Sequence, residues 1–295
     1  MTENFKPHKT NNQTGQKYSP EEWAEKKQAE KDEIYKLVDD TALDVVNNPE
    51  HFENYLNTQS RLDRYSAVNT LLIYAQKPEA SQLKSYADWA QDNVRVKRGE
   101  KSISMLEPTE YIKKDGSQGI AYNIKKVFDV SQTSGRRASA PTANRNPREL
   151  VKAMLHTSEV DVQYVDCLPY EDRPSYYDND KQTLYVKKGN KDTVALCQSV
   201  AQELGYAQLS MNSDVYSRRD LGFNAACIGY MLCKKYGVDA QAFNISDIPD
   251  KLRNAEPKEI KRELSGIRQS MNEIATRVTN ELYRQKQARS QEMAR

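Results

Sequence analysis

A short stretch in the second half of the chain has the spacing of a helical zinc site but not its residue types. Two histidines four residues apart lie on one face of a helix and can bind zinc, and a glutamate after the first histidine can activate a zinc-bound water. Here the corresponding positions are Gln202, Glu203 and Tyr206. The glutamate is present and both imidazoles are absent. Without a metal, we expect Glu203 to be either a carboxylate on a helix face or a buried, hydrogen-bonded carboxylate.

The rest of the sequence offers no replacement for the missing ligands. The three histidines are His8, His51 and His156, which lie far from Glu203 along the chain. The sequence has no phosphate-binding loop of the G-x-x-x-x-G-K-[ST] type, no G-x-S-x-G motif and no clustered carboxylates of a two-metal site. These observations predict a protein without metal or cofactor and without enzymatic activity.

Composition bounds the class of protein further. The 295 residues carry a net charge of only +2, so any binding of nucleic acid needs a local basic patch. No apolar run approaches the roughly 18 residues that cross a bilayer, and the N-terminus has no apolar core of a signal peptide. Four cysteines without a C-x-x-C pair favour buried free thiols over zinc ligands or disulfides. We expect a cytoplasmic protein with no membrane contact.

The elements of the first half change from a helical to an alternating period. Ser19, Pro20 and Glu22 predict a helix start, and the helix is expected to reach residue 46. Apolar spacings of three and four predict two helices between residues 49 and 76, and a short helix at 86–91. Alternating residues then predict an antiparallel sheet with an Asp-Gly turn, with strands at 94–99, 102–108, 110–114 and 121–130.

The second half is predicted to be mostly helical, so the fold class is α+β. Helices are expected at 147–156, 192–209 and 218–236, and strands at 160–165 and 183–186. From residue 257 apolar residues alternate in steps of four and three, at Ile260, Leu264, Ile267, Met271, Ile274 and Val278. This heptad pattern predicts either a homodimeric coiled coil through residues 257–295 or a helix that packs on its own domain.

Four separated motifs connect the first half to a known family. They are YSAVNTLLI, AQKPEA, KRGEKSISMLEP and VFDVSQT, all within residues 45–133. Together they resemble the N-terminal domain of ArdC-like antirestriction proteins, which are carried on conjugative plasmids and integrative elements. In that family the domain binds single-stranded DNA, and the resemblance implies the same activity here.

The second half resembles the zincin-type metallopeptidase domain that follows in this family. The resemblance places Gln202 and Tyr206 at the two histidine positions and Ala226, within FNAACIGYMLCKKYGVD, at the position of an acidic third ligand. Only Glu203 matches the family pattern. A glutamine amide or an un-ionised tyrosine is a poor substitute for imidazole, so the resemblance implies a degenerate metal site and an inactive domain.

The resemblance also makes the basic and aromatic residues of the first half candidates for DNA contact. Single strands are bound by cationic tracks and stacked aromatic rings. Residues 94–128 contain eight Lys or Arg and four acidic residues, a local charge of +4. Tyr65, Trp89 and Phe128 are also expected as core residues. The candidate DNA-binding residues are Arg61, Arg64, Tyr65, Arg95, Lys97, Arg98, Lys101, Tyr111, Tyr122, Lys125 and Lys126.

These expectations define the predicted organisation: a disordered tail at 1–18, a single-stranded DNA-binding domain at 19–133, a linker at 134–147, a degenerate zincin-like domain at 148–250 and a basic helix at 251–295. On the resemblance, the protein is expected to protect transferred DNA of a mobile element during conjugation, with antirestriction activity. The alternative is a non-enzymatic scaffold that recruits a protein of the conjugation or restriction machinery through its second domain and heptad helix.

Overall fold

The structure is a computed structural model that describes residues 18–113, 115–134, 146–170, 173–212 and 216–293. The predicted tail, apart from Tyr18, and the greater part of the predicted linker, 135–145, lie outside these ranges. The predicted boundaries between domains therefore stay a prediction.

The helices of the first half form where their caps predict them. Ser19 and Glu22 make a reciprocal capping box at the start of the first helix, and Asn48 caps the second through the backbone N–H groups of Glu50 and His51. The first helix is continuous over 28 residues. The helices are α1 (Pro20–Asn47), α2 (Pro49–Arg61), α3 (Ala67–Gln76) and α4 (Tyr86–Gln91).

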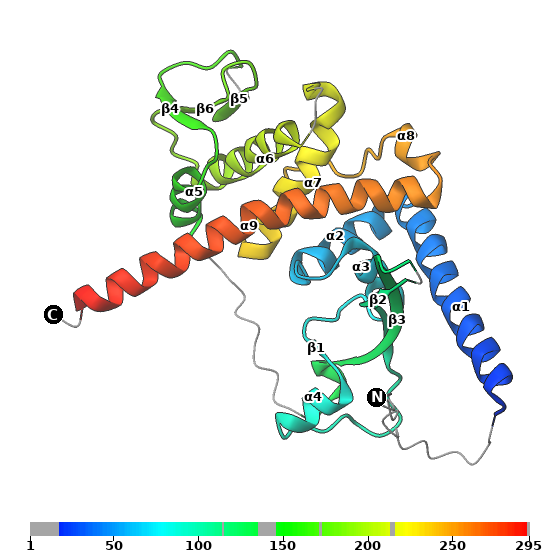
Figure 1. The fold of residues 1–295 in the computed structure, drawn as a ribbon. Helices are drawn as coiled ribbons and strands as arrows, with labels where there is room; N and C mark the ends of the chain where they lie inside the picture. Colours follow the sequence, from blue (N-terminus) through cyan, green and yellow to red (C-terminus); the bar gives the residue numbers. More distant parts are fainter. Residues whose placement is uncertain (1–17, 114, 135–145, 171–172, 213–215, 294–295) are drawn as a thin grey trace.

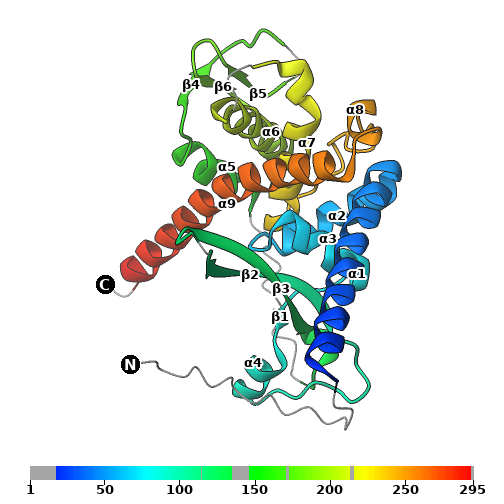
Figure 2. The same cartoon turned by 45° about the vertical axis from the view of Figure 1, so that its right-hand side comes forward.

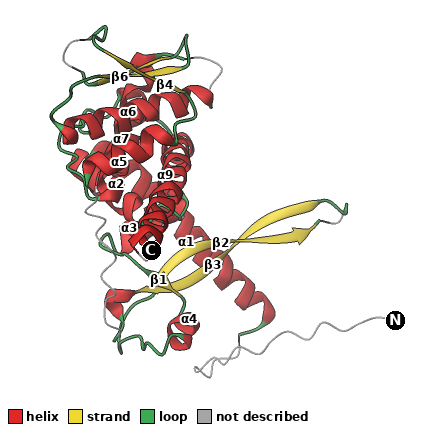
Figure 3. Cartoon of the chain, turned by 90° about the vertical axis from the view of Figure 1, so that its left-hand side faces the viewer, coloured by secondary structure: helices red, strands yellow, loops and turns green. Residues whose placement is uncertain are grey.

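The first sheet is antiparallel, with strand order β1-β3-β2. Its strands are β1 (Leu83–Lys84), β2 (Ile103–Ile112) and β3 (Gln118–Asp129), and a 3-10 turn, Val130–Gln132, follows β3. Two predicted strands, 102–108 and 110–114, are one strand, because Pro108 lies on the edge of the sheet, where its missing N–H is tolerated. The distal part of the β2–β3 hairpin projects from the helical body (Figure 3).

The predicted strand at residues 94–99 is wrong. The chain there makes a single bridge, Val96 to Thr133, and then turns back at Gly99, whose φ is +86°. A turn so close to the bridge leaves no room for a ladder, so the alternation of Val94, Val96 and the basic residues lies on a loop. This loop, residues 94–102, connects α4 to β2 at the base of the hairpin.

A second sheet, with strand order β4-β6-β5, belongs to the second half. β4 is parallel to β6, and β5 is antiparallel to it; β5 was not predicted. The bounds are α5 (Pro147–His156), β4 (Asp161–Val165), β5 (Ser175–Asp178), β6 (Thr183–Lys187), α6 (Thr193–Met211), α7 (Arg218–Tyr236), α8 (Asp250–Arg253) and α9 (Pro257–Met293). The α+β class is thus confirmed.

Helix α9 lies across both halves of the molecule (Figures 1 and 2). It contacts α1 and α3 on one side and α5, α6 and α7 on the other. All six heptad residues are buried within the chain, as is Leu282. The coiled-coil interpretation of this seam, and with it a homodimer through the seam, is therefore wrong, and the alternative of packing within the chain is observed.

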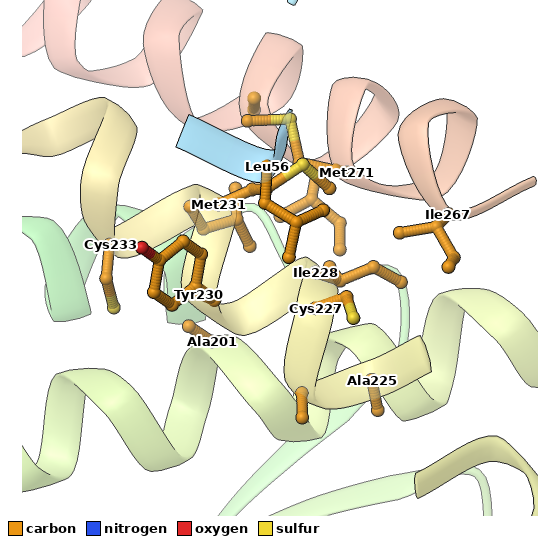
Figure 4. Packing of buried hydrophobic residues seen from close by; sticks show 14 of the residues in the cluster. Leu56, Ala201, Ala225, Cys227, Ile228, Tyr230, Met231, Cys233, Ile267 and Met271 are labelled. Atoms are coloured by element: carbon orange, nitrogen blue, oxygen red, sulfur yellow. The ribbon is translucent and has the colours of Figure 1, made fainter. Parts of the chain in front are cut away.

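Helix α7 is the centre of the main core. Ile228 and Met231 pack toward Ile267 and Met271 of α9, with Leu56 of α2 beside them (Figure 4). The prediction of buried thiols is confirmed for Cys197, Cys227 and Cys233 and wrong for Cys167, which is exposed. Of the helices within the described ranges, none is long and apolar enough to cross a membrane.

Candidate nucleic-acid interface and degenerate metal site

Glu203 lies in the core between helix α6 and the second sheet. Its side chain is only 2% exposed and forms an ion pair with Arg218 at the start of α7. Its other oxygen, Oε2, accepts a hydrogen bond from the backbone N–H of Tyr177 at 2.8 Å. Arg173 is more distant, with Nη1 3.9 Å from Oε1. Both carboxylate oxygens are therefore occupied by protein donors.

Arg218 also contacts the residue at the second histidine position. Its guanidinium carbon lies 4.0 Å from the ring centroid of Tyr206 and 4.7 Å from that of Tyr176. Burial alone would lower the pKa of Arg218, but the hydrogen bond and Coulombic attraction to Glu203 outweigh it and raise that pKa. For Tyr206, burial raises the pKa, and this effect outweighs the lowering by the nearby guanidinium. The pair is a charged arginine on a neutral phenol.

The other two positions of the predicted degenerate site, Gln202 and Ala226, lie on the same α6–α7 contact, and Gln202 is a hydrogen-bond neighbour of Tyr206. Gln202 and Ala226 line a cavity of about 380 Å³ together with Phe243 and Asp247. The two helices approach closely because Gly205 has no side chain: a Cβ there would lie 3.2 Å from the carbonyl oxygen of Ala225.

The residues present do not fit a metal ion. Glu203 is bonded to Arg218 and Tyr177, and its helix neighbours are an amide and a phenol. No group of three or more His, Cys, Asp or Glu that could hold a metal occurs in the part of the chain that the structure describes. The sequence did not reveal Arg218, because its pairing with Glu203 depends on the packing of α7 against α6.

Four of the basic candidates lie on the loop between α4 and β2. Arg95, Lys97, Arg98 and Lys101 are all exposed. The amino group of Lys97 donates to the backbone oxygen of Ser131 at 2.9 Å. Within the described ranges none of the four forms an ion pair with a carboxylate, so their charges remain available to an anion. We call these four residues the basic loop.

Two further lysine candidates are already neutralised. Lys125 pairs with Glu107, and Lys126 pairs with Glu30 of α1 at 2.8 Å. The hydrogen bond that Lys125 donates to Glu107 raises the pKa of Lys125. As neighbours on one strand, the two lysines point to opposite faces of the hairpin and do not form one track.

The two tyrosine candidates lie on the projecting part of the hairpin. Tyr111 is 47% and Tyr122 is 45% exposed. Tyr111 pairs with Gly119, and Tyr122 with Pro108, so the two rings lie on opposite faces. A Cβ at Gly119 would lie 2.7 Å from the Tyr111 ring, so this glycine gives the ring its place on the strand. At about 3.3 Å per residue, Tyr111 is roughly 26 Å along β2 from Ile103, which lies next to the basic loop.

The candidates from the helices have mainly structural contacts. Arg61 donates to the backbone oxygens of Pro78 and Ala80, and Tyr65 is half-buried with its hydroxyl 3.5 Å from the Leu83 oxygen. Arg64 is exposed in the turn between α2 and α3.

Aromatic residues near β1 divide between core and surface. Trp89 is 3% exposed, and its indole N–H donates to the oxygen of Phe128, as expected of a core residue. Sequence reasoning missed Tyr86, which is 66% exposed and packs edge-on against the Phe128 ring at a centroid distance of 6.4 Å. Its place at the start of α4 puts it at the same end of the sheet as the basic loop. The predicted DNA-binding residues are therefore not one track: the basic loop, the hairpin tyrosines and Arg64 are exposed, whereas the other candidates are paired or held by structural contacts.

Comparison with known proteins identifies the class of the first half. Residues 27–146 match the family described as the N-terminal domain of anti-restriction factor ArdC. This segment includes α2, α3, α4, the first sheet, the basic loop and most of α1. This part of the chain is therefore similar to the N-terminal domain of ArdC.

Particular relatives extend over more of the chain. An uncharacterized protein of Bacillus anthracis, pXO2-81, is 21% identical over 84% of this chain, which spans about half (51%) of that relative. The metal-free crystal structure of the antirestriction protein ArdC from plasmid R388 is 16% identical, with a TM-score of 0.48 over 73% of this chain and 86% of that one. Its Mn(II)-bound structure is 14% identical, with a TM-score of 0.48 over 74% and 84%.

Proposed function

We propose that this chain is an antirestriction protein of a mobile element that binds single-stranded DNA through its first half. The observation that carries the proposal is the basic loop: four exposed cations that have no carboxylate partner among the described residues, on the segment that matches the N-terminal domain of ArdC. Cations already paired with carboxylates gain little from a phosphate, whereas unpaired ones gain a charge-assisted hydrogen bond and release counterions.

The geometry suits a flexible single strand better than a rigid duplex. Phosphates bind the basic loop, and unstacked bases pack on Tyr86 beside it. Tyr111 and Tyr122 lie farther out on the hairpin and on opposite faces, so a strand must bend to reach both. Duplex DNA keeps its bases stacked and offers no ring face to these side chains.

The second half acts in this proposal without peptidase activity. A zincin needs three protein ligands and a glutamate free to activate water. Here Arg218 and Tyr177 bind both oxygens of Glu203, and Gln202, Tyr206 and Ala226 offer no imidazole or carboxylate. We assign this half a structural and partner-binding role in the cytoplasm.

The direct test is fluorescence anisotropy of a labelled single strand titrated with the full chain. We expect binding that weakens with salt and that an excess of unlabelled duplex does not displace. Failure of the full chain to bind at low salt, or equal displacement by duplex, contradicts the proposed DNA activity. A casein or peptide cleavage assay with added Zn²⁺ or Mn²⁺ is expected to show no turnover.

The antirestriction role is tested in cells. Transfer of unmodified plasmid DNA into a restricting host is compared with and without this chain expressed in the recipient. We expect expression to raise the recovery of transferred plasmid, and a variant with all four basic-loop residues replaced by glutamine to lose this effect. Equal recovery in all three strains contradicts the role even if DNA binding is retained.

A protein-recruiting function is the second candidate, and one surface favours it. Ile112 and Ile120 on the projecting hairpin are 77% and 64% exposed, on the same face as Tyr122. Exposed apolar side chains at such a protrusion are typical of contact sites. If Ile112→Ser and Ile120→Ser abolish protection of transferred DNA while single-strand binding is unchanged, recruitment becomes the leading function.

A further inference from the structure

The environment of Glu203 requires a cation in the core. A carboxylate that is 2% exposed is strongly destabilised unless an opposite charge and hydrogen bonds compensate it. Arg218 supplies this charge, and its guanidinium also makes contacts beyond the ion pair with Glu203. Its Nη1 donates to the backbone oxygen of Tyr177 at 3.3 Å, and its guanidinium lies over the Tyr206 ring. One cation thus joins α6, α7 and β5.

We propose that Arg218 is a built-in cation that takes the electrostatic place of a divalent metal between α6, α7 and β5. The guanidinium contacts Glu203 and Tyr206, two positions of the frame at which a metal-binding helix would carry its base and its second ligand. A metal at that place would tie a helix to neighbouring elements, and Arg218 does so through its own hydrogen bonds. This inference goes beyond the proposed DNA function and is independent of it.

Two consequences follow for metal ions. The second half keeps its fold without a divalent cation, because the compensating charge is covalently part of the chain. A metal is also excluded, because two positive charges in a site of low dielectric repel each other strongly. Restoring the missing ligands is therefore not sufficient to restore a metal site while Arg218 is present.

The charge role is tested by a double-mutant cycle on the full chain. Arg218→Met leaves Glu203 buried and without its opposite charge, so we expect a lower Tm. Adding Glu203→Gln to Arg218→Met is expected to restore much of the lost Tm. Additive losses of Tm in the double variant overturn the charge role.

The exclusion of metal is tested by installing ligands with and without the arginine. One variant carries Gln202→His, Tyr206→His and Ala226→Glu, and a second carries the same changes plus Arg218→Met. With Zn²⁺ and Mn²⁺ as probes, we expect calorimetric binding and a rise in Tm only for the second. Equal metal binding by both variants overturns the proposal, since a merely structural ion pair would not block a metal.

The wild-type chain supplies a further measurement that does not depend on the folding of these variants. Its Tm is expected to be the same in EDTA and in added Zn²⁺ or Mn²⁺. A lower Tm in EDTA, or stoichiometric metal retained through dialysis, overturns the proposal directly. These outcomes are separate from DNA binding, which is measured on the other half of the molecule.

Discussion

Replacing the four residues of the basic loop by glutamine is expected to weaken single-strand binding and to flatten its salt dependence. Arg95, Lys97, Arg98 and Lys101 are exposed, and none pairs with a carboxylate of the described chain, so each can neutralise one phosphate. Each phosphate contact with a single strand contributes about 0.7 to the slope of log K against log salt. Four contacts give about 2.8, which over a fourfold rise in salt is about a 50-fold loss of affinity that the variant should not show.

The assay is anisotropy of a labelled single strand at a series of salt concentrations between about 50 and 200 mM, a range in which such slopes are well measured. The control replaces four exposed lysines of the second half by glutamine, which changes the net charge equally; these are Lys152, Lys191, Lys251 and Lys258. The control is expected to keep the wild-type slope. A wild-type slope in the basic-loop variant, or an equal loss in the control, refutes the assignment of phosphates to this loop.

Three further predictions concern the core, an acid-sensitive contact and the hairpin. Ile267→Ala is expected to lower the free energy of unfolding, measured by urea titration, by about 2–5 kcal/mol, because the Ile267 side chain is buried within the chain. Unchanged stability together with an altered mass in light scattering would instead favour a dimer contact at this residue. Burial alone would raise the pKa of Asp129, but hydrogen bonds from Ser131, Ser81 and Gln82 outweigh it and hold that pKa below its usual value. The stability from this lowered pKa is present above about pH 4 and is lost as the pH falls through the folded pKa, so Asp129→Asn should flatten the acid limb of stability against pH. Tyr122→Ala is expected to weaken single-strand binding by about 1–3 kcal/mol, with exposed Tyr164→Ala as the control, and equal affinities would remove Tyr122 from the interface.

The sequence predicted the helices well because their capping residues are adjacent in sequence to the helix ends. Ser19 and Glu22 set the start of α1, and the end of α7 coincides with Gly237, whose φ is +73°. The short strands could not be predicted in this way. β1 and β5 have two and four residues, and they exist because β3 and β6 pair with them. Whether such a short segment forms a strand depends on a partner strand that is distant in sequence. Residues 94–99 have the apolar and polar alternation of a strand, but they form a loop because they have no partner ladder.

The candidate sites show the same division between local and long-range information. The spacing of Gln202, Glu203 and Tyr206 on one helix followed from sequence, but Arg218 comes from the next helix and is positioned only by the packing of α7 on α6. The sequence alone did not show which basic residues of the first half form ion pairs. Only the fold distinguishes Lys125 and Lys126, which form ion pairs, from the basic loop, which has no carboxylate partner in the part of the chain that the structure describes.

The position of α9 has a consequence for how the chain is made. Its apolar face completes cores that also contain α1, α3, α5, α6 and α7, yet it is translated after all of them. Between Leu72 in α3 and Leu282 in α9 the ribosome adds about 200 residues, which takes about 10–40 s at typical rates of synthesis. Throughout that interval the apolar surface beneath α9 faces solvent on the nascent chain. Chaperone capture during synthesis, followed by release once α9 emerges, is the expected course of its folding.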